Sequence, residues 1–299
     1  MQLEGDVRLC WKASGPACWF ILILISAPVS SAGEGGYFVT YSHQMEEPGN
    51  LEISFFTTSG KPDGGNRFVN TVMELEYGLK GWWTTEVYLH GQTTFSDSSV
   101  FTGYRWENRF RLLPREHWIN PVFYFEWEDI NGADKSVLEV VGFDGAADLA
   151  GPNSEARREK KRELEAKMIL SSNVKGWNIS GNFVAEKNIA HAPFEFGYAV
   201  GVNRPLALEA SPKMCSLCCE NFRAGVELYG GLGTHQSFGF QRGTSHYIAP
   251  TLAWELPSGV TVQISPGFGL TAGSNSFLLR VAATYEIPQF GRAARRLFR

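Results

Sequence analysis

The sequence predicts an all-β protein: a transmembrane up-and-down antiparallel β-barrel of about twelve strands, of the Gram-negative outer-membrane type. Segments of roughly ten residues alternate apolar and polar side chains, and the breaks between them are alternately short and long. No apolar run reaches the length of a membrane-spanning helix, so strands must cross the bilayer. The hydrophobic fraction of 43% and the mean hydropathy of −0.16 agree with this, because half of each such strand is polar.

The segment 104–112 shows the alternation most clearly. One face carries Tyr104, Trp106, Phe110 and Leu112, and the other carries Arg105, Glu107, Arg109 and Arg111. Charged faces of this kind recur too regularly along the chain to be explained as ordinary solvent-exposed surface, so we expect them to face a barrel lumen. The alternative is an ordinary secreted domain.

The N-terminus has the three parts of a secretory signal peptide. Arg8 and Lys12 supply positive charge, residues 18–25 form a short apolar run, and small residues precede a cleavage site before Gly33. We therefore expect export to the outer membrane of a Gram-negative bacterium. The predicted parts of the chain are a signal peptide (1–32), an N-terminal periplasmic segment (33–49), the barrel (50–287) and a basic C-terminal tail (288–299).

Twelve strands follow in order, and their even number places both termini on the periplasmic side. They are predicted near residues 50–58, 67–78, 82–92, 102–113, 118–128, 163–173, 177–187, 194–202, 221–230, 245–255, 260–270 and 277–287. The connections 78–81, 114–117, 173–176 and 256–259 are tight turns, whereas 59–66, 92–100, 129–162 and 230–244 are mostly longer. Residues 129–162 form the longest predicted extracellular loop.

Tryptophan follows three of the short turns, at Trp82-Trp83, Trp118 and Trp177. Because Trp prefers the membrane–water interface, these residues predict an aromatic girdle at the periplasmic rim.

An insertion at 203–220 departs from the short-turn rule and carries Cys215, Cys218 and Cys219. This odd number in an exported chain predicts a disulfide-capped turn with one spare thiol. Half of a metal site is the alternative.

The inward face of the strands is rich in charge. The predicted lumen-lining residues are Glu74, Glu76, Glu86, His90, Arg105, Glu107, Arg109, Arg111, Glu126, Glu128, Glu165, Lys167, Arg223, Glu227 and Arg280, with Glu52, Glu186, Glu195, Glu255 and Glu286 on the same face. Two interpretations stay open. The charges brace the wall of a narrow barrel, or Arg105, Arg109 and Arg111 face Glu126 and Glu128 and orient a permeating solute.

The expected partners are outer-membrane lipid, a small-molecule solute and the barrel-assembly machinery during biogenesis. The formal net charge of −4 gives no basic surface of the kind that binds nucleic acid, so no nucleic-acid partner is expected. No catalytic residue, metal site or cofactor is expected.

Several segments resemble the outer-membrane family named after the meta-cleavage pathway of phenol degradation. They are 246–255 with the turn 256–259, 277–286, Leu51-Glu52-Ile53, 163–167 and 227–230. The resemblance implies an outer-membrane barrel that helps small, often hydrophobic or aromatic, compounds to cross. Two features depart from it: the chain runs on through Pro288 to Arg299 after the last strand, and the Cys-bearing segment is an insertion.

Two other functions compete with a channel. A structural or receptor barrel is one. The other is a phospholipase-like enzyme, because His235 and Ser237 resemble that family's His-x-Ser-Asn-Gly. Phe238 stands where Asn is expected to orient the imidazole, so we predict that Ser237 is not a nucleophile.

Overall fold

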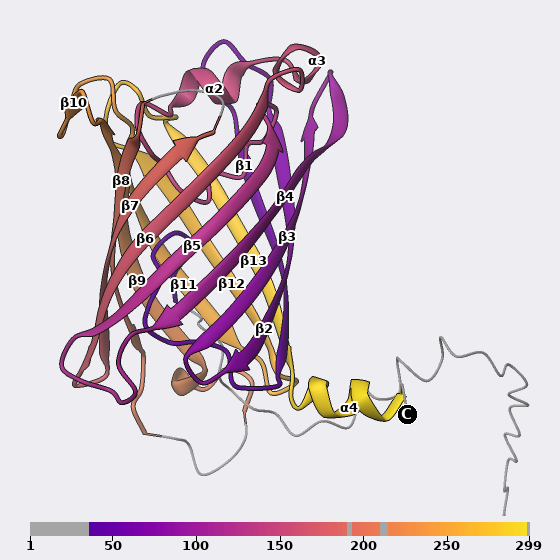
Figure 1. The fold of residues 1–299 in the computed structure, drawn as a ribbon, viewed down its shortest axis with the longest axis vertical. Helices are drawn as coiled ribbons and strands as arrows, with labels where there is room; N and C mark the ends of the chain where they lie inside the picture. The colour runs from indigo at the N-terminus through magenta and orange to yellow at the C-terminus, as the bar shows by residue number, and fades with distance from the viewer. Residues whose placement is uncertain (1–35, 190–192, 210–214, 298–299) are drawn as a thin grey trace, which may run out of the picture.

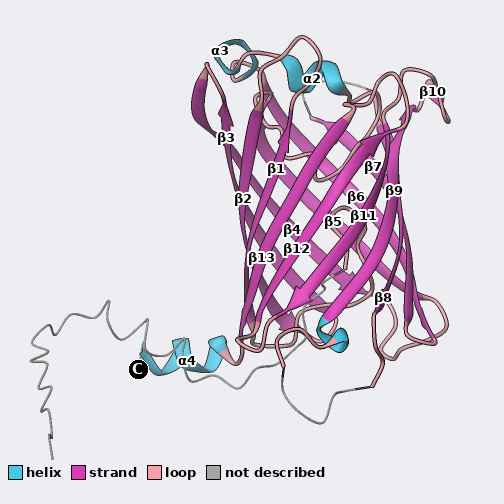
Figure 2. Cartoon of the chain, turned by 180° about the vertical axis from the view of Figure 1, so that it is seen from behind, coloured by secondary structure: helices cyan, strands magenta, loops and turns pink. Residues whose placement is uncertain are grey.

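The computed structural model describes residues 36–189, 193–209 and 215–297. The predicted signal peptide lies outside the described residues. Thirteen strands form one sheet, and without the two-residue β10, twelve of them close a barrel through pairing of β13 with β1 (Figures 1 and 2). Each long strand is antiparallel to both of its neighbours. The predicted fold class is confirmed.

The strands lie close to their predicted positions. They are β1 (Leu51–Gly60), β2 (Phe68–Lys80), β3 (Trp83–Thr94), β4 (Ser98–Arg111), β5 (Asn120–Asn131), β6 (Lys160–Val174), β7 (Trp177–Asn188), β8 (Glu195–Pro205), β9 (Phe222–Thr234), β10 (Ser237–Phe238), β11 (His246–Glu255), β12 (Val260–Gly269) and β13 (Phe277–Ile287). The turn between β6 and β7 has positive φ at Lys175 (52°) and Gly176 (81°). Both central residues of a type I′ hairpin turn require this conformation, which explains the glycine.

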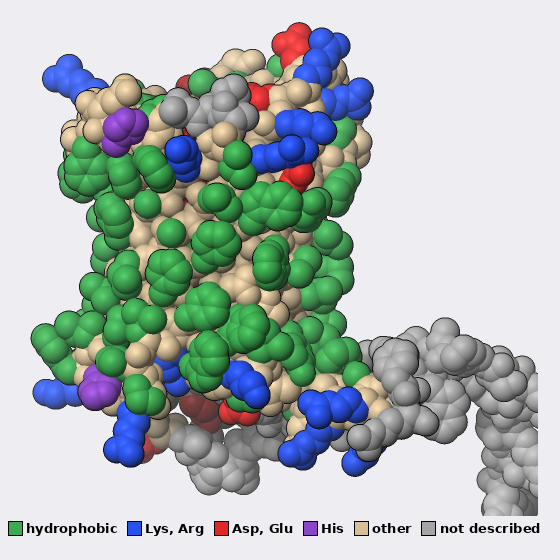
Figure 3. All heavy atoms as spheres, viewed as in Figure 1, with side chains coloured by type: hydrophobic (Ala, Val, Ile, Leu, Met, Phe, Trp, Pro, Cys, Tyr) green, Lys and Arg blue, Asp and Glu red, His purple; other side chains and the backbone are tan. Residues whose placement is uncertain are grey.

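On the side of the barrel seen in Figure 3, hydrophobic side chains form a broad band and the charged side chains gather at the two rims. Trp106 and Phe123 are exposed, whereas their neighbours Arg105 and Tyr124 are buried. Trp82, Trp118 and Trp177 are exposed beside the short turns, as the predicted girdle requires.

The strand register makes a direct prediction for labelling. In a background with the exposed free thiol removed by Cys219→Ser, Phe125→Cys should react with a lipid-soluble reagent and poorly with an aqueous one. Phe125 points outward from β5 and the adjacent Glu126 is 1% exposed inside the barrel. Equal aqueous labelling of Phe125→Cys and Glu126→Cys would contradict this register.

The long connections lie at one end of the barrel, called here the loop end, and most tight turns at the other, the turn end (Figure 1). β5 and β6 extend into the predicted loop 129–162, and α2 (Ala146–Ala150) and α3 (Asn153–Ala156) lie in what remains. The predicted loop 92–100 is instead a tight turn between β3 and β4.

The Cys-bearing connection lies between β8 and β9 at the turn end and ends in the short 3-10 helix η1 (Cys219–Asn221). A disulfide joins Cys215 to Cys218, and Cys219 is free and exposed. This matches the predicted disulfide with one spare thiol.

The predicted periplasmic segment is placed differently by the structure. Residues 36–48, called here the N-terminal lumen segment, run inside the barrel, where Tyr37, Val39 and His43 are buried. A bridge between Pro48 and Gly78 is the backbone pairing of this segment among the described residues. The N–H groups of residues 38–41 instead find side-chain acceptors on the inner wall. The basic tail begins with α4 (Phe290–Leu297) at the turn end (Figure 2). Among the described residues, no helix combines the length and apolar character needed to cross a bilayer.

Candidate functional site

The predicted lumen-lining residues lie on the inward faces of their strands. All but two of them are buried. The exceptions, Arg111 and Arg223, are partly exposed. That these residues line a path for solutes stays a prediction.

The strand register brings glutamates from nine consecutive strands into one row. Each member is directly opposite the next across the sheet, in the order Glu286, Glu52, Glu76, Glu86, Glu107, Glu126, Glu165, Glu186 and Glu195. We call this set the glutamate row. Like charges directly opposite one another destabilise a sheet, so a row of this length needs compensating charge or a role that requires it.

Arg109 compensates the middle of the row. It is fully buried, and its guanidinium lies 2.6 Å from the carboxylate of Glu76, 2.5 Å from that of Glu86 and 3.3 Å from that of Glu107. Farther along, Lys167 lies 2.6 Å from Glu165.

The predicted pairing of Arg105, Arg109 and Arg111 with Glu126 and Glu128 holds for one arginine only. Arg105 lies 3.3 Å from Glu126 and 3.2 Å from Glu128. The register places Arg109 opposite Tyr124, so its guanidinium turns to β2 and β3 instead. Arg111 lies opposite Val122 and donates to the carbonyl of His43 at 3.3 Å.

The N-terminal lumen segment is held chiefly by one carboxylate of the wall. Glu227 on β9, 0% exposed, accepts the backbone N–H groups of Phe38, Val39 and Thr40 at 2.9, 2.9 and 2.7 Å. A charged acceptor on three donors is a strong attachment. One residue farther on, the N–H of Tyr41 donates to Asn182 at 2.6 Å.

A glycine on β8 makes room for this segment. At Gly201 a Cβ would lie 2.4 Å from the ring of Tyr37, so only glycine admits the ring. The Tyr37 hydroxyl reaches past it to the Asn178 side chain at 2.9 Å.

A second segment fills the lumen from the loop end. Residues 132–145, called here the inserted loop, fold inward, and Asp134 lies 3.2 Å from His90 and 2.7 Å from the Thr102 hydroxyl. Glu139 forms a close ion pair with Arg105. The Ser136 carbonyl accepts a hydrogen bond from Thr58 at 2.8 Å.

Two carboxyls of the inserted loop have displaced pKa values. Burial by itself raises the pKa of Asp134, but the charge and hydrogen bond of His90 hold it well below its usual range. Burial raises the pKa of Asp144 to about 7, against the opposing charge of Lys161. The inserted loop thus carries one firmly ionised carboxylate and one that titrates near neutrality.

The two segments approach one another inside the barrel. The Lys167 amine lies 4.8 Å from the ring centre of Tyr41 and 4.0 Å from the carboxylate of Glu139, so it contacts both. Val39 and Val140 belong to one buried apolar cluster. Cavities of about 90 Å³ beside the inserted loop and about 80 Å³ beside the N-terminal lumen segment remain. A third cavity, of about 180 Å³ and lined by His43 and Arg111, lies near the turn end.

Sequence reasoning missed the residues that these segments contribute, namely Tyr37, Tyr41, Asp134 and Glu139. Inward-facing strand residues can be recognised in a sequence because they recur with a period of two. These segments have no such period. One signal was available: several apolar residues interrupt the predicted polar loop between Asp134 and Val141.

His235 and Ser237 lie at β10 and beside it, at the loop end. Their side chains form hydrogen bonds with other residues and not with each other in the described structure. The Ser237 hydroxyl accepts from the Gln241 amide at 2.8 Å, and the His235 Nδ1 accepts from the backbone of Phe194 at 3.2 Å. We expect Ser237→Ala to leave any phospholipid hydrolysis by the purified protein unchanged, measured as fatty acid release from mixed micelles. Hydrolysis abolished by this substitution would establish the enzyme instead.

Comparisons with known proteins give distant likenesses. No family model matches the chain, and no curated protein matches it. Among solved structures, an outer-membrane channel from Pseudomonas putida F1 aligns with a TM-score of 0.48 and 11% identity over 81% of this chain and 97% of that one. The NanC porin aligns with a TM-score of 0.46 and 10% identity, over 79% of this chain and 100% of that one. The CymD monoaromatic hydrocarbon channel aligns with a TM-score of 0.42 and 7% identity, over 82% of this chain and 88% of that one. No functional conclusion for this chain follows from scores this low. The resemblance to the phenol meta-cleavage family stays a prediction.

Proposed function

We propose that this protein is a gated channel for small solutes in the outer membrane of a Gram-negative bacterium. The observation that carries the proposal is that two segments outside the wall fill a polar lumen. Hydrogen bonds and ion pairs hold them there, and water can replace such contacts when a segment withdraws. The glutamate row then lines the path.

The charge of the row supports a preference for cations. Carboxylates outnumber the arginines and lysine on the inner wall, and rings of carboxylates attract cations and repel anions in pores. Aromatic solutes suit the same path, because Tyr37, Phe38, Tyr41, Phe56 and Tyr88 line the 80 Å³ cavity.

The test is ion current through the refolded protein in a planar bilayer. We expect a low conductance with brief openings, and a reversal potential in a KCl gradient that shifts toward the value for potassium. Aromatic solutes added to one side should block the openings. A reversal potential that indicates chloride selectivity would contradict the role given to the glutamates.

A structural barrel is the second candidate, and the buried ion pairs of Arg109 favour it. Buried charges of this kind can fix one arrangement of the wall without any transport. No current in the wild type, together with no uptake defect in a deletion strain, would select this function.

A further inference from the structure

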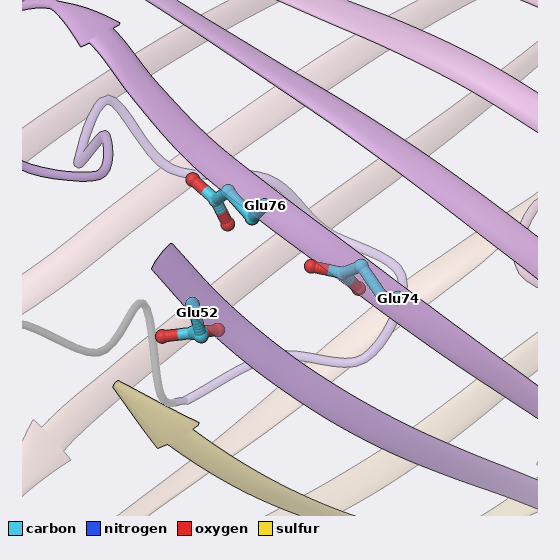
Figure 4. Close-up of side chains that lie close together, drawn as sticks. All are labelled: Glu52, Glu74 and Glu76. Atoms are coloured by element: carbon cyan, nitrogen blue, oxygen red, sulfur yellow. The ribbon is translucent and has the colours of Figure 1, made fainter. Parts of the chain in front are cut away.

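We propose that Glu52, Glu74 and Glu76 bind a divalent cation, with Ca²⁺ the best fit, between the barrel wall and the N-terminal lumen segment. The three glutamates come from β1 and β2, and one carboxylate oxygen from each lies within 4.8 Å of the others. Figure 4 shows the three side chains gathered beside these two strands. The sequence alone predicted no metal site.

The register forces these carboxylates together. Glu52 is directly opposite Glu76, and Glu74 is the next inward-facing residue of β2. All three are buried. Three carboxylates this close, away from bulk water, repel one another strongly unless a cation or protons neutralise them.

Protein cations do not neutralise the whole group. Arg109 reaches Glu76, but it is also shared with Glu86 and Glu107. The Ser54 hydroxyl donates to Glu52 at 3.2 Å. Glu74, 6% exposed, forms no hydrogen bond or ion pair among the described residues. Glu74 therefore adds to the group a carboxylate without an ion-pair partner in the described structure.

An independent observation comes from the other side of the cavity. Thr40, on the N-terminal lumen segment, is 5% exposed, and its Oγ1 has no hydrogen-bond partner in the described structure. Thr40 lines the same 80 Å³ cavity as the three glutamates. A buried hydroxyl without a partner is costly, and a bound cation with its water would satisfy it.

The donor set and the space select the ion. Every donor is an oxygen, as hard cations prefer, and neither cysteine nor histidine lines the cavity. About 80 Å³ admits an ion with one or two waters, since a water occupies about 30 Å³. Ca²⁺ tolerates irregular sets of six to eight oxygens, whereas Mg²⁺ demands a near-ideal octahedron.

Bound Ca²⁺ would tie Thr40 to the wall on the side opposite Glu227. The cation site goes beyond the proposed channel and does not depend on it, because binding is measured in detergent without any current.

The experiment is calorimetric titration of CaCl₂ into the full chain, folded in detergent micelles and stripped with a chelator. We expect one Ca²⁺ per chain, with Glu74→Gln weakening binding by about tenfold or more because calcium affinity follows the number of charged ligands. Thr40→Val, which changes no charge, should weaken it less. The control Glu155→Gln removes an exposed carboxylate of α3 and should leave binding unchanged.

Folding of each variant is checked by the mobility of unheated samples in electrophoresis. If Glu74→Gln does not fold, Thr40→Val decides, since it keeps every charged group of the wall. Wild type that binds no Ca²⁺, or folded variants that bind as wild type does, would overturn the proposal. Loss of binding in Glu128→Gln alone would assign the ion to the second acidic group, Glu128, Glu139 and Glu186, and would overturn it equally.

Discussion

Replacing Glu227 with alanine is expected to open the proposed channel. The substitution leaves three N–H groups of the N-terminal lumen segment, two of them buried, without their acceptor, and each buried unsatisfied group costs about 1–3 kcal/mol. That cost falls on the closed state alone, because a withdrawn segment donates to water. A loss of only about 1.4 kcal/mol shifts the equilibrium tenfold, so the open probability should rise by about tenfold or more.

The measurement is single-channel current in planar bilayers, with the unfolding temperature measured in parallel. Gly201→Leu should have the same effect by a different route, since its side chain would occupy the place of the Tyr37 ring. Gly181→Leu is the matched control, because a Cβ there meets no atom within 4 Å. Open probability unchanged in both Glu227→Ala and Gly201→Leu would show that this segment does not control the current.

Replacing Arg109 with alanine is expected to cost more stability than any other single change in the lumen. Arg109 is 0% exposed and holds three carboxylates of three different strands. Removing one partner of a buried ion pair leaves uncompensated charge, typically at about 3–5 kcal/mol. The outer face keeps its apolar residues, so the barrel should still insert into lipid.

Chemical denaturation of the protein in detergent measures this loss. Arg111→Ala removes the same charge from the same strand at a partly exposed position with one hydrogen bond, so it should cost much less. Arg109→Lys keeps the charge and loses the forked geometry, so intermediate stability is expected. Equal stability of the Arg109→Ala and Arg111→Ala variants would mean that Arg109 does not brace the wall.

The sequence predicted the wall of this barrel well because the wall obeys local rules. A strand facing lipid on one side and polar lumen on the other must alternate, and a slip by one residue would expose charge to hydrocarbon. Arg105 and Trp106 show this: their adjacent positions already assigned them to opposite faces. The turn at Lys175-Gly176 is equally local.

Only the tertiary structure shows which of these inward-facing residues contact one another inside the barrel. Each glutamate of the row was predicted to face inward. Their alignment across the sheet depends on the register between neighbouring strands, and the alternation of residues within one strand carries no information about that register. The same holds for Glu227, whose partners lie almost 190 residues away in the chain. The N-terminal lumen segment and the inserted loop have no period of two, because they contact side chains of the wall and form only single bridges, at Pro48, Val141 and Gly142, among the described residues. Their place inside the barrel follows from contacts distant in sequence, so only the folded wall determines it.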